Sequence, residues 1–266
     1  MNRQIIPAEI EQRIILRFVD LEKEEKVKIV YAVESGSRAW GFESADSDYD
    51  IRFIFCRPTN HYLEIDERRD VIELPITDDL DFSGWDIKKA LKLFRKSNPP
   101  LLEWLDSPHV YVDKYDFSRA LRDALPHRFS PTASFYHYLH MAQNNFKKYL
   151  IHERVQHKKY FYVLRPVLAG KWLEAGYGSV PTKFETLLRR TIPDGELLTL
   201  VTDLLHRKRQ GMEKTLEPNI PVLHDFLATE LQRLSKMHLE KDTRKQSNDD
   251  LNRLFQSTLE KAWDSS

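Results

Sequence analysis

Residues 36–55 of this chain read GSRAWGFESADSDYDIRFIF. From Asp48 onward the stretch alternates polar and apolar residues, which is typical of a strand with one buried face. Successive side chains on a strand point to opposite faces, so Asp48 and Asp50 share one face. The apolar side chains between and after them then point toward the core: Tyr49, Ile51, Phe53 and Phe55. The pattern predicts a pair of carboxylates on one face of a strand.

The spacing of the two carboxylates suits divalent cations. Residues two apart on a strand have Cα atoms roughly 6.5–7 Å from each other, so these side chains can converge on two ions about 3.5–4 Å apart. Two like charges side by side are costly without a cation, so we expect the pair to bind metal. A calcium loop starting at Asp46 is excluded, because it needs glycine at Ile51 and glutamate at Arg57.

A turn of small residues precedes the acidic pair. Residues 27–33 are rich in β-branched and aromatic side chains, which predicts a buried strand that runs directly into this turn. At Gly36 the backbone can approach a ligand closely, and the Ser37 hydroxyl with nearby N–H groups can hold phosphate oxygens. The turn and the acidic pair together indicate a site for a nucleoside triphosphate with its magnesium.

The rest of the chain falls into two parts of different texture. In the first, we expect a helix over 7–24, strands at 71–74, 79–82 and 110–112, and helices from Asp86 to about 97 and over 101–105. After residue 113 every strong signal is helical: 115–125, 132–153, 158–175, 182–190, 196–207, 221–237 and 248–263. The sequence predicts an α+β chain, with a mixed-sheet catalytic domain over 1–126 and an all-helical domain over 127–266.

Composition excludes several classes of protein. Lys and Arg total 41, and so do Asp and Glu, which argues against a wholly basic nucleic-acid-coating protein, so any attraction for polyanions must be local. A single cysteine, Cys56, excludes an intramolecular disulfide framework. The first residues lack an apolar stretch like that of a signal sequence, and the longest apolar runs are too short to cross a bilayer. We expect a cytoplasmic protein without a membrane partner.

Three blocks of sequence carry a resemblance to a known family. They are residues 36–55, DFSGWDIKKALKLFRKSNPPLLEWLDSP over 81–108, and KKYFYVLRPVLAGKWL over 158–173. The Gly-Ser turn followed by Asp-x-Asp resembles the polymerase-β-like nucleotidyltransferase superfamily. The three blocks in order are most similar to the YcgL-like predicted nucleotidyltransferases, named the RNA repair pathway DNA polymerase beta family. The last 90 residues add no motif to this match.

The resemblance implies a palm-like catalytic domain and a set of metal ligands. By position, Asp48 and Asp50 would ligate two Mg²⁺ ions, with Mn²⁺ as an alternative, and the Gly36–Ser37 turn would hold the triphosphate. The family pattern also expects a third carboxylate on a neighbouring strand. We choose Asp81 for this role, although Asp79 has the same strand parity. Asp86 is better explained as the N-cap of the following helix.

Basic residues elsewhere could contact the nucleotide. Lys159, Tyr162 and Arg165 are spaced by three, so they can line one helical face and meet the triphosphate and base across a cleft. The family resemblance supports this interpretation. Arg38 could equally reach a phosphate or face solvent. The basic run at 206–209 is interpreted as a solvated helix end.

These observations lead to one expected function and two alternatives. We expect a magnesium-dependent nucleotidyltransferase that transfers a nucleoside monophosphate from an NTP to an acceptor hydroxyl and releases pyrophosphate. The family description favours RNA as the acceptor, in repair or end processing. One alternative is adenylylation of a protein acceptor, as in toxin-neutralising relatives of the superfamily. The other is a catalytically inactive module that binds nucleotide or RNA.

Overall fold

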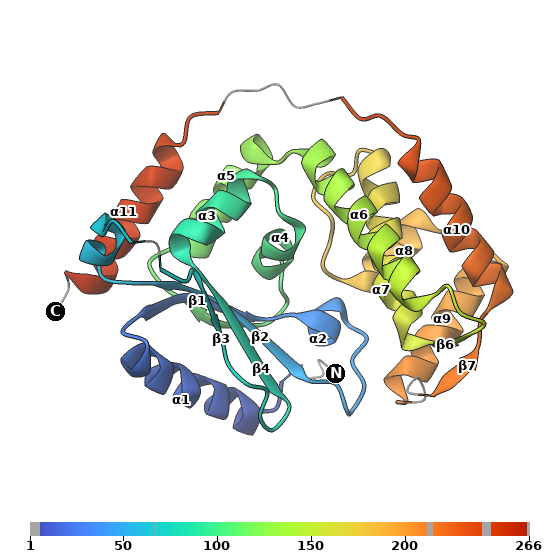
Figure 1. Cartoon of the computed structure of the whole chain (residues 1–266), viewed down its shortest axis with the longest axis horizontal. Coiled ribbons are helices and arrows are strands. Elements are labelled where there is room, and N and C mark those ends of the chain that lie inside the picture. The colour runs from blue at the N-terminus through green and yellow to red at the C-terminus, as the bar shows by residue number, and fades with distance from the viewer. Residues whose placement is uncertain (1–5, 67, 212–214, 241–245, 265–266) are drawn as a thin grey trace.

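A mixed sheet and a group of helices lie side by side in the computed structural model of the chain (Figure 1). The structure describes residues 6–66, 68–211, 215–240 and 246–264. The α+β class that the sequence predicts is confirmed. Within these ranges, no helix has both the length and the apolar character that crossing a membrane requires.

Five strands form the sheet in the order β3-β4-β2-β1-β5. Their bounds are β1 (Lys28–Glu34), β2 (Tyr49–Cys56), β3 (Val71–Glu73), β4 (Leu80–Asp86) and β5 (Val110–Asp113). The pairing is antiparallel except between β2 and β4, which run parallel with Asp50 directly opposite Asp81. β4 is longer than the expected 79–82, because it continues until the Asp86 carboxylate caps the next helix.

Helices cover both faces of the sheet. α1 (Ala8–Glu24) packs on one face against Ile51, Phe53 and Phe55 of β2. The opposite face, which carries Ile54, lies under four helices. They are α3 (Ile87–Arg95), α4 (Pro99–Leu105), α5 (Phe117–Arg128) and α11 (Asp249–Trp263). Because side chains alternate along β2, Asp50 belongs to the face opposite α1.

The helical part surrounds its own apolar core. Its helices are α6 (Pro131–Tyr149), α7 (Lys158–Glu174), α8 (Phe184–Thr191), α9 (Glu196–Arg209) and α10 (Pro221–Ser235). α7 is buried on nearly every side and forms the centre of this core. One detail differs from the all-helical expectation, since β6 (Arg154–Gln156) pairs with β7 (Leu216–Pro218). Strands of three residues are too short to show an alternating pattern in the sequence.

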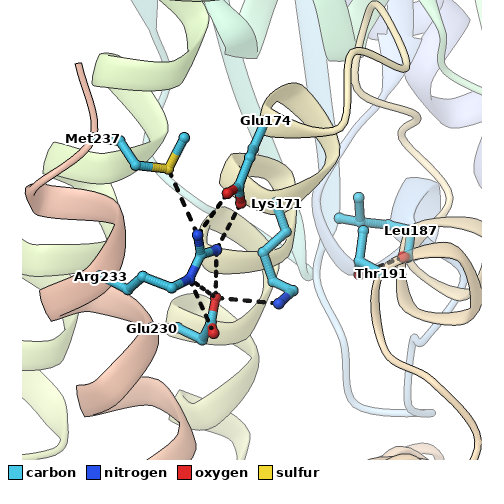
Figure 2. Close-up of polar contacts among 7 residues, drawn as sticks. All are labelled: Lys171, Glu174, Leu187, Thr191, Glu230, Arg233 and Met237. Atoms are coloured by element: carbon cyan, nitrogen blue, oxygen red, sulfur yellow. Dashed lines mark hydrogen bonds and ion pairs between the residues drawn. The ribbon is translucent and has the colours of Figure 1, made fainter. Parts of the chain in front are cut away.

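A cluster of charged side chains joins α10 to α7 (Figure 2). Arg233 places its two terminal nitrogens 2.6 Å from the two carboxylate oxygens of Glu174. Glu230 accepts from Arg233 at 2.9 Å and from Lys171 at 3.2 Å. Arg233 is more than a third exposed, so these pairs mainly fix the orientation of α10, while apolar contacts hold it.

The last helix returns to the first part of the chain. Leu251 and Leu259 of α11 belong to the same buried cluster as α3 and α5, and Asp250 forms an ion pair with Arg128 of α5. Figure 1 shows α11 on the far side of the sheet from α10. The division into domains over 1–126 and 127–266 stays a prediction. The structure adds that residues 249–263 pack with the first part.

Two short helices complete the first part of the chain. α2 (Gly36–Trp40) joins β1 to the segment before β2, and a 3₁₀ helix, η1 (Thr59–Leu63), follows β2.

Gly84 of β4 lies against a buried ring of the neighbouring strand. A Cβ atom at this position would be 2.1 Å from Cε2 of Phe53. Gly84→Ala should therefore overpack the core and lower the free energy of unfolding by about 3 kcal/mol. Denaturant unfolding measures this loss. Phe53→Leu should relieve the overlap, so the double variant should lose less than the sum of the single variants; additive losses would contradict the stated cause.

Candidate active site

A cavity of about 550 Å³ lies between the first part of the chain and helices α6 and α7. Its walls come from α2, the segment after it, the start of β2, β4, α4, and one face each of α6 and α7, with Lys208 of α9. Six of the residues that the sequence analysis assigned to a site line it: Gly36, Ser37, Asp48, Asp50, Tyr162 and Arg165. Arg38, Asp81 and Lys159 are not among the lining residues.

The turn at Gly36 packs closely against the Asp50 side chain. The Ser35 N–H donates to the carbonyl oxygen of Asp50 at 2.8 Å, which brings the turn against the start of β2. Gly36 has a φ of +57°, and a Cβ there would lie 1.9 Å from Oδ2 of Asp50. No other residue fits, because any side chain would occupy the place of the carboxylate. The N–H groups in the first turn of a helix have no acceptor within that helix. In α2 these groups therefore lie beside Asp50.

An arginine joins the two facing carboxylates. Nη2 of Arg52 lies 2.8 Å from Oδ1 of Asp50 and 2.8 Å from Oδ2 of Asp81. Nη1 of the same guanidinium donates to the Asp81 carbonyl oxygen at 2.9 Å. Both carboxylates are about a quarter exposed. Arg52 was not singled out from the sequence, because its pairing with Asp81 depends on the register between two strands.

Negative charge is concentrated around Asp50. Burial raises the pKa of its carboxyl, the Arg52 guanidinium lowers it, and the neighbouring carboxylates of Asp81 and Asp48 raise it again. Within the described ranges no three side chains of metal-binding type already converge on a point. The donor set nevertheless fits magnesium, because Asp48 and Asp50 present carboxylate oxygens to the cavity and the site gains from added positive charge.

The other two candidates for a third carboxylate have different surroundings. Asp79 precedes β4 in an exposed turn with a φ of +62°. Asp86 is buried, and its carboxylate accepts from the Lys88 N–H at 2.7 Å and from the Tyr62 hydroxyl at 2.8 Å. The expectation that Asp86 caps a helix is confirmed. Asp81 is thus the one of the three that faces Asp50 across the β2–β4 pair.

Arg38 holds the segment that carries Asp48. Its guanidinium donates to the carbonyl oxygens of Ser47 at 2.7 Å and of Asp48 at 3.3 Å, and it stacks over the Tyr49 ring at 3.8 Å. The side chain is buried at 8% exposure. The solvated position is therefore wrong, and Arg38 shapes the loop from within; its contact with a phosphate stays a prediction.

A buried glutamate of α4 connects the two parts of the chain. One oxygen of Glu103 accepts from Arg165 at 2.6 Å and from the Tyr138 hydroxyl at 3.0 Å, and the other accepts from Trp40 Nε1 at 3.0 Å. Arg165 is only 3% exposed. Its charge is therefore matched inside the protein, although the side chain borders the cavity. Glu103 was not predicted, since its partners lie 35 to 63 residues away in the sequence.

Of the remaining basic residues, some line the cavity and others lie beside it. Nζ of Lys159 lies 4.6 Å from the ring centres of both Tyr149 and Tyr162, and burial lowers the pKa of this amine. Lys158, one residue earlier, lines the cavity together with Tyr162. Lys208 also lines it and is 7% exposed, which differs from the solvated helix end expected at 206–209. α9 packs against the turn after α2 here.

A second buried acid lies behind the site. Glu34, at the end of β1, accepts from the Asp50 N–H at 3.0 Å and from the Tyr111 hydroxyl at 2.6 Å. It has no exposed surface, and burial raises the pKa of its carboxyl to about 7. The sequence analysis did not single out Glu34, because this residue directly follows a run of apolar residues in a predicted strand.

Glu103→Gln should destabilise the protein strongly. The substitution leaves the buried Arg165 guanidinium without a matching charge, so we expect the free energy of unfolding to fall by about 3 kcal/mol. Glu185→Gln is the matched control, because it breaks an exposed pair with Arg189 on α8 and should cost less than about 1 kcal/mol. Equal losses in denaturant unfolding would contradict the importance of the buried pair.

Glu34→Gln should flatten part of the pH dependence of stability. Between about pH 4.5 and 7 the folded protein holds a proton on Glu34 that the unfolded chain releases, so the stability due to this group falls as pH rises through that window. Each pKa unit corresponds to about 1.4 kcal/mol. Unfolding free energies of wild type minus Glu34→Gln should therefore decline from pH 4.5 to 7 and then level off. A constant difference would show that Glu34 titrates normally.

Comparison with known proteins places the chain in a family. A family model described as the RNA repair pathway DNA polymerase beta family matches residues 10–257. An uncharacterized protein of Bacillus subtilis (strain 168), YcgL, is 48% identical over 255 residues, which cover 96% of this chain and 98% of that protein. The family match continues to residue 257, and so covers most of the last 90 residues, where the sequence analysis found no motif. The family's name points to a polymerase-β-like nucleotidyltransferase in an RNA repair pathway. The chain belongs to the RNA repair pathway DNA polymerase beta family.

Proposed function

We propose that the protein is a magnesium-dependent nucleotidyltransferase that transfers a nucleoside monophosphate from an NTP to a hydroxyl of RNA and releases pyrophosphate. The observation that carries the proposal is the contact between Gly36 and the Asp50 carboxylate on the wall of a large cavity. It brings the N–H groups of a helix start to a cluster of acids. Phosphate oxygens and the cations that accompany them need these two environments side by side.

The chain's own groups would bind the triphosphate. The turn at Gly36 and Ser37 would donate backbone N–H groups to it, and Lys158 and Lys208 add positive charge to the same cavity. Tyr162, also in the lining, offers a ring for the base. Arg165 acts in this scheme by positioning α7 rather than by holding phosphate.

The acids would hold two magnesium ions, and manganese could replace them. Asp48 and Asp50 supply the ligands that face the cavity, and Asp81 completes the set beside Asp50. When bound, the ions would neutralise phosphate charge and favour the ionised form of the acceptor hydroxyl. Asp81 also offers a carboxylate oxygen that can take the proton of that hydroxyl. Arg52 supplies the positive charge that lets Asp50 and Asp81 lie side by side in the structure.

Incubation of the protein with each α-labelled NTP, magnesium, and either RNA or a protein extract tests the reaction. Label on RNA that depends on Mg²⁺ supports the proposal. Label on a polypeptide would instead support adenylylation of a protein. Absence of any transfer, with NTP binding retained, would support an inactive binding module.

Separate substitutions of the acids test their roles. Asp48→Asn or Asp50→Asn should abolish transfer, because each removes a charged ligand from the cavity. Asp81→Asn should lower the rate by orders of magnitude with NTP affinity unchanged. Asp86→Asn is the control, since loss of a cap should cost about 1 kcal/mol of stability and leave the reaction intact. An active Asp81→Asn with an inactive, folded Asp86→Asn would show that the third carboxylate lies at the helix start.

A further inference from the structure

One exposed face of α3 is strongly basic. It carries Lys88, Lys92, Arg95 and the C-cap residue Lys96, all of them exposed; we call these four residues the α3 stripe. At 100° per residue they fall within about 100° of arc on the helix surface. The opposite face of α3 is buried against the sheet and α11, so the α3 stripe is held in a fixed orientation.

Neighbouring acids match the charges of the α3 stripe only in part, since Lys88 and Lys92 also border a hollow that Glu64, Asp66, Asp70 and Asp86 line. None of its four side chains forms an ion pair with any residue that the structure describes. Basic residues close to it do have partners: Arg68 pairs with Glu64, Arg69 with Glu73, and Lys89 with Asp70. The net charge of the chain is zero, so this is a local excess and not a property of the whole surface.

Helix stability does not explain the α3 stripe. Cations near the C-terminal end of a helix, such as Arg95 and Lys96, interact favourably with the helix dipole. Lys88 lies in the first turn, where a positive charge is unfavourable. Its position there, on the same face as the other three, fits an external anion better than a role in helix stability.

A groove between α3 and α11 continues the basic surface. It has a volume of about 210 Å³ and is lined on one side by Lys88, Lys92 and Arg95. Asn248 and Asn252 line the other side, the apolar side chains of Leu91, Leu251 and Phe255 complete the lining, and no carboxylate is part of it. The hollow on the other side of Lys88 and Lys92 is lined by acidic residues as well, so the α11 side is the one suited to a polyanion.

We propose that the α3 stripe and this groove bind backbone phosphates of the acceptor RNA, away from its reacting end. This inference rests on the proposed function. α3 begins where β4 ends, and the five residue-to-residue steps from Asp81 to Asp86 span roughly 17 Å of strand, so the surface begins that far from the acids. Lys88 to Lys96 extend over about 12 Å of helix, the length of some three phosphates at the roughly 3.4 Å spacing of a nucleic-acid strand.

The chemistry of the surface favours RNA over a bilayer. A helix that inserts into a membrane presents an apolar face, and that face of α3 is buried within the protein. Cations in a row with amides opposite suit repeated phosphates.

Binding of a labelled RNA hairpin with a single-stranded 3′ end tests the proposal. The measurement uses the full chain, fluorescence anisotropy and a series of salt concentrations. K88Q/K92Q/R95Q/K96Q should raise the Kd at least about tenfold at 0.1 M salt and reduce the log–log salt slope by about 3, since each phosphate contact contributes roughly 0.7–0.9. NTP affinity should not change.

The control removes the same charge from scattered exposed positions. K23Q/K26Q/K183Q/K236Q should alter the RNA affinity by less than about twofold. Equal RNA affinities for the two quadruple variants would overturn the proposal. We call K88Q/K92Q/R95Q/K96Q the stripe variant. If it unfolds, K88Q/K92Q and R95Q/K96Q are measured separately, and each should produce about half of the change in the salt slope.

Transfer assays separate this proposal from the function on which it rests. With a dinucleotide acceptor, too short to reach α3, the stripe variant should react as wild type does, whereas a long RNA should show a raised KM and an unchanged kcat. If wild type transfers nothing to RNA of any length, the proposed function fails; a loss of RNA binding in the stripe variant alone would still support the surface.

Discussion

The close packing of Gly36 on the Asp50 carboxylate is the constraint around which the first part of the chain is built. It requires a residue without a side chain at φ +57°, and it places the start of α2 against the start of β2. The same aspartate is held by residues of both strands that flank β2. Its N–H is held by buried Glu34, and Arg52 links its carboxylate to Asp81 on the parallel neighbour. A shift of any of these elements would separate the acids from the turn.

The second organising interaction fixes the helical part relative to this cluster. Glu103 accepts hydrogen bonds from Trp40 of α2 and Arg165 of α7, so one buried carboxylate connects the helix that begins at Gly36 with the opposite wall of the cavity. An ion pair so deeply buried contributes to geometry more than to net stability, because desolvation offsets much of its attraction. The side chains that fix the two parts thus also line the cavity and help to shape it.

Local patterns in the sequence predicted the features that depend on near neighbours. Strand alternation placed Asp50 on β2, whereas Asp48, expected on the same strand, lies one residue before it, and the cap at Asp86 was confirmed. Helical spacing placed Arg165 and Tyr162 on the cavity wall, but spacing cannot show that Arg165 meets Glu103 from another helix. Arg52, Glu103 and Glu34 went unnoticed because their partners are brought by tertiary contacts. The β6–β7 pair was missed because three-residue strands leave no periodic signal.

Metal binding at the acids tests the central claim most directly. Mn²⁺ titrated into the protein with a non-hydrolysable NTP analogue can be followed by the electron paramagnetic resonance signal of the free ion, with the contribution of the analogue alone subtracted. We expect the wild-type chain to remove about two ions from solution. Asp50→Asn should remove fewer, whereas Asp86→Asn should match wild type. Equal Mn²⁺ binding by wild type and Asp50→Asn would contradict the assignment of a metal site to the Asp50 cluster.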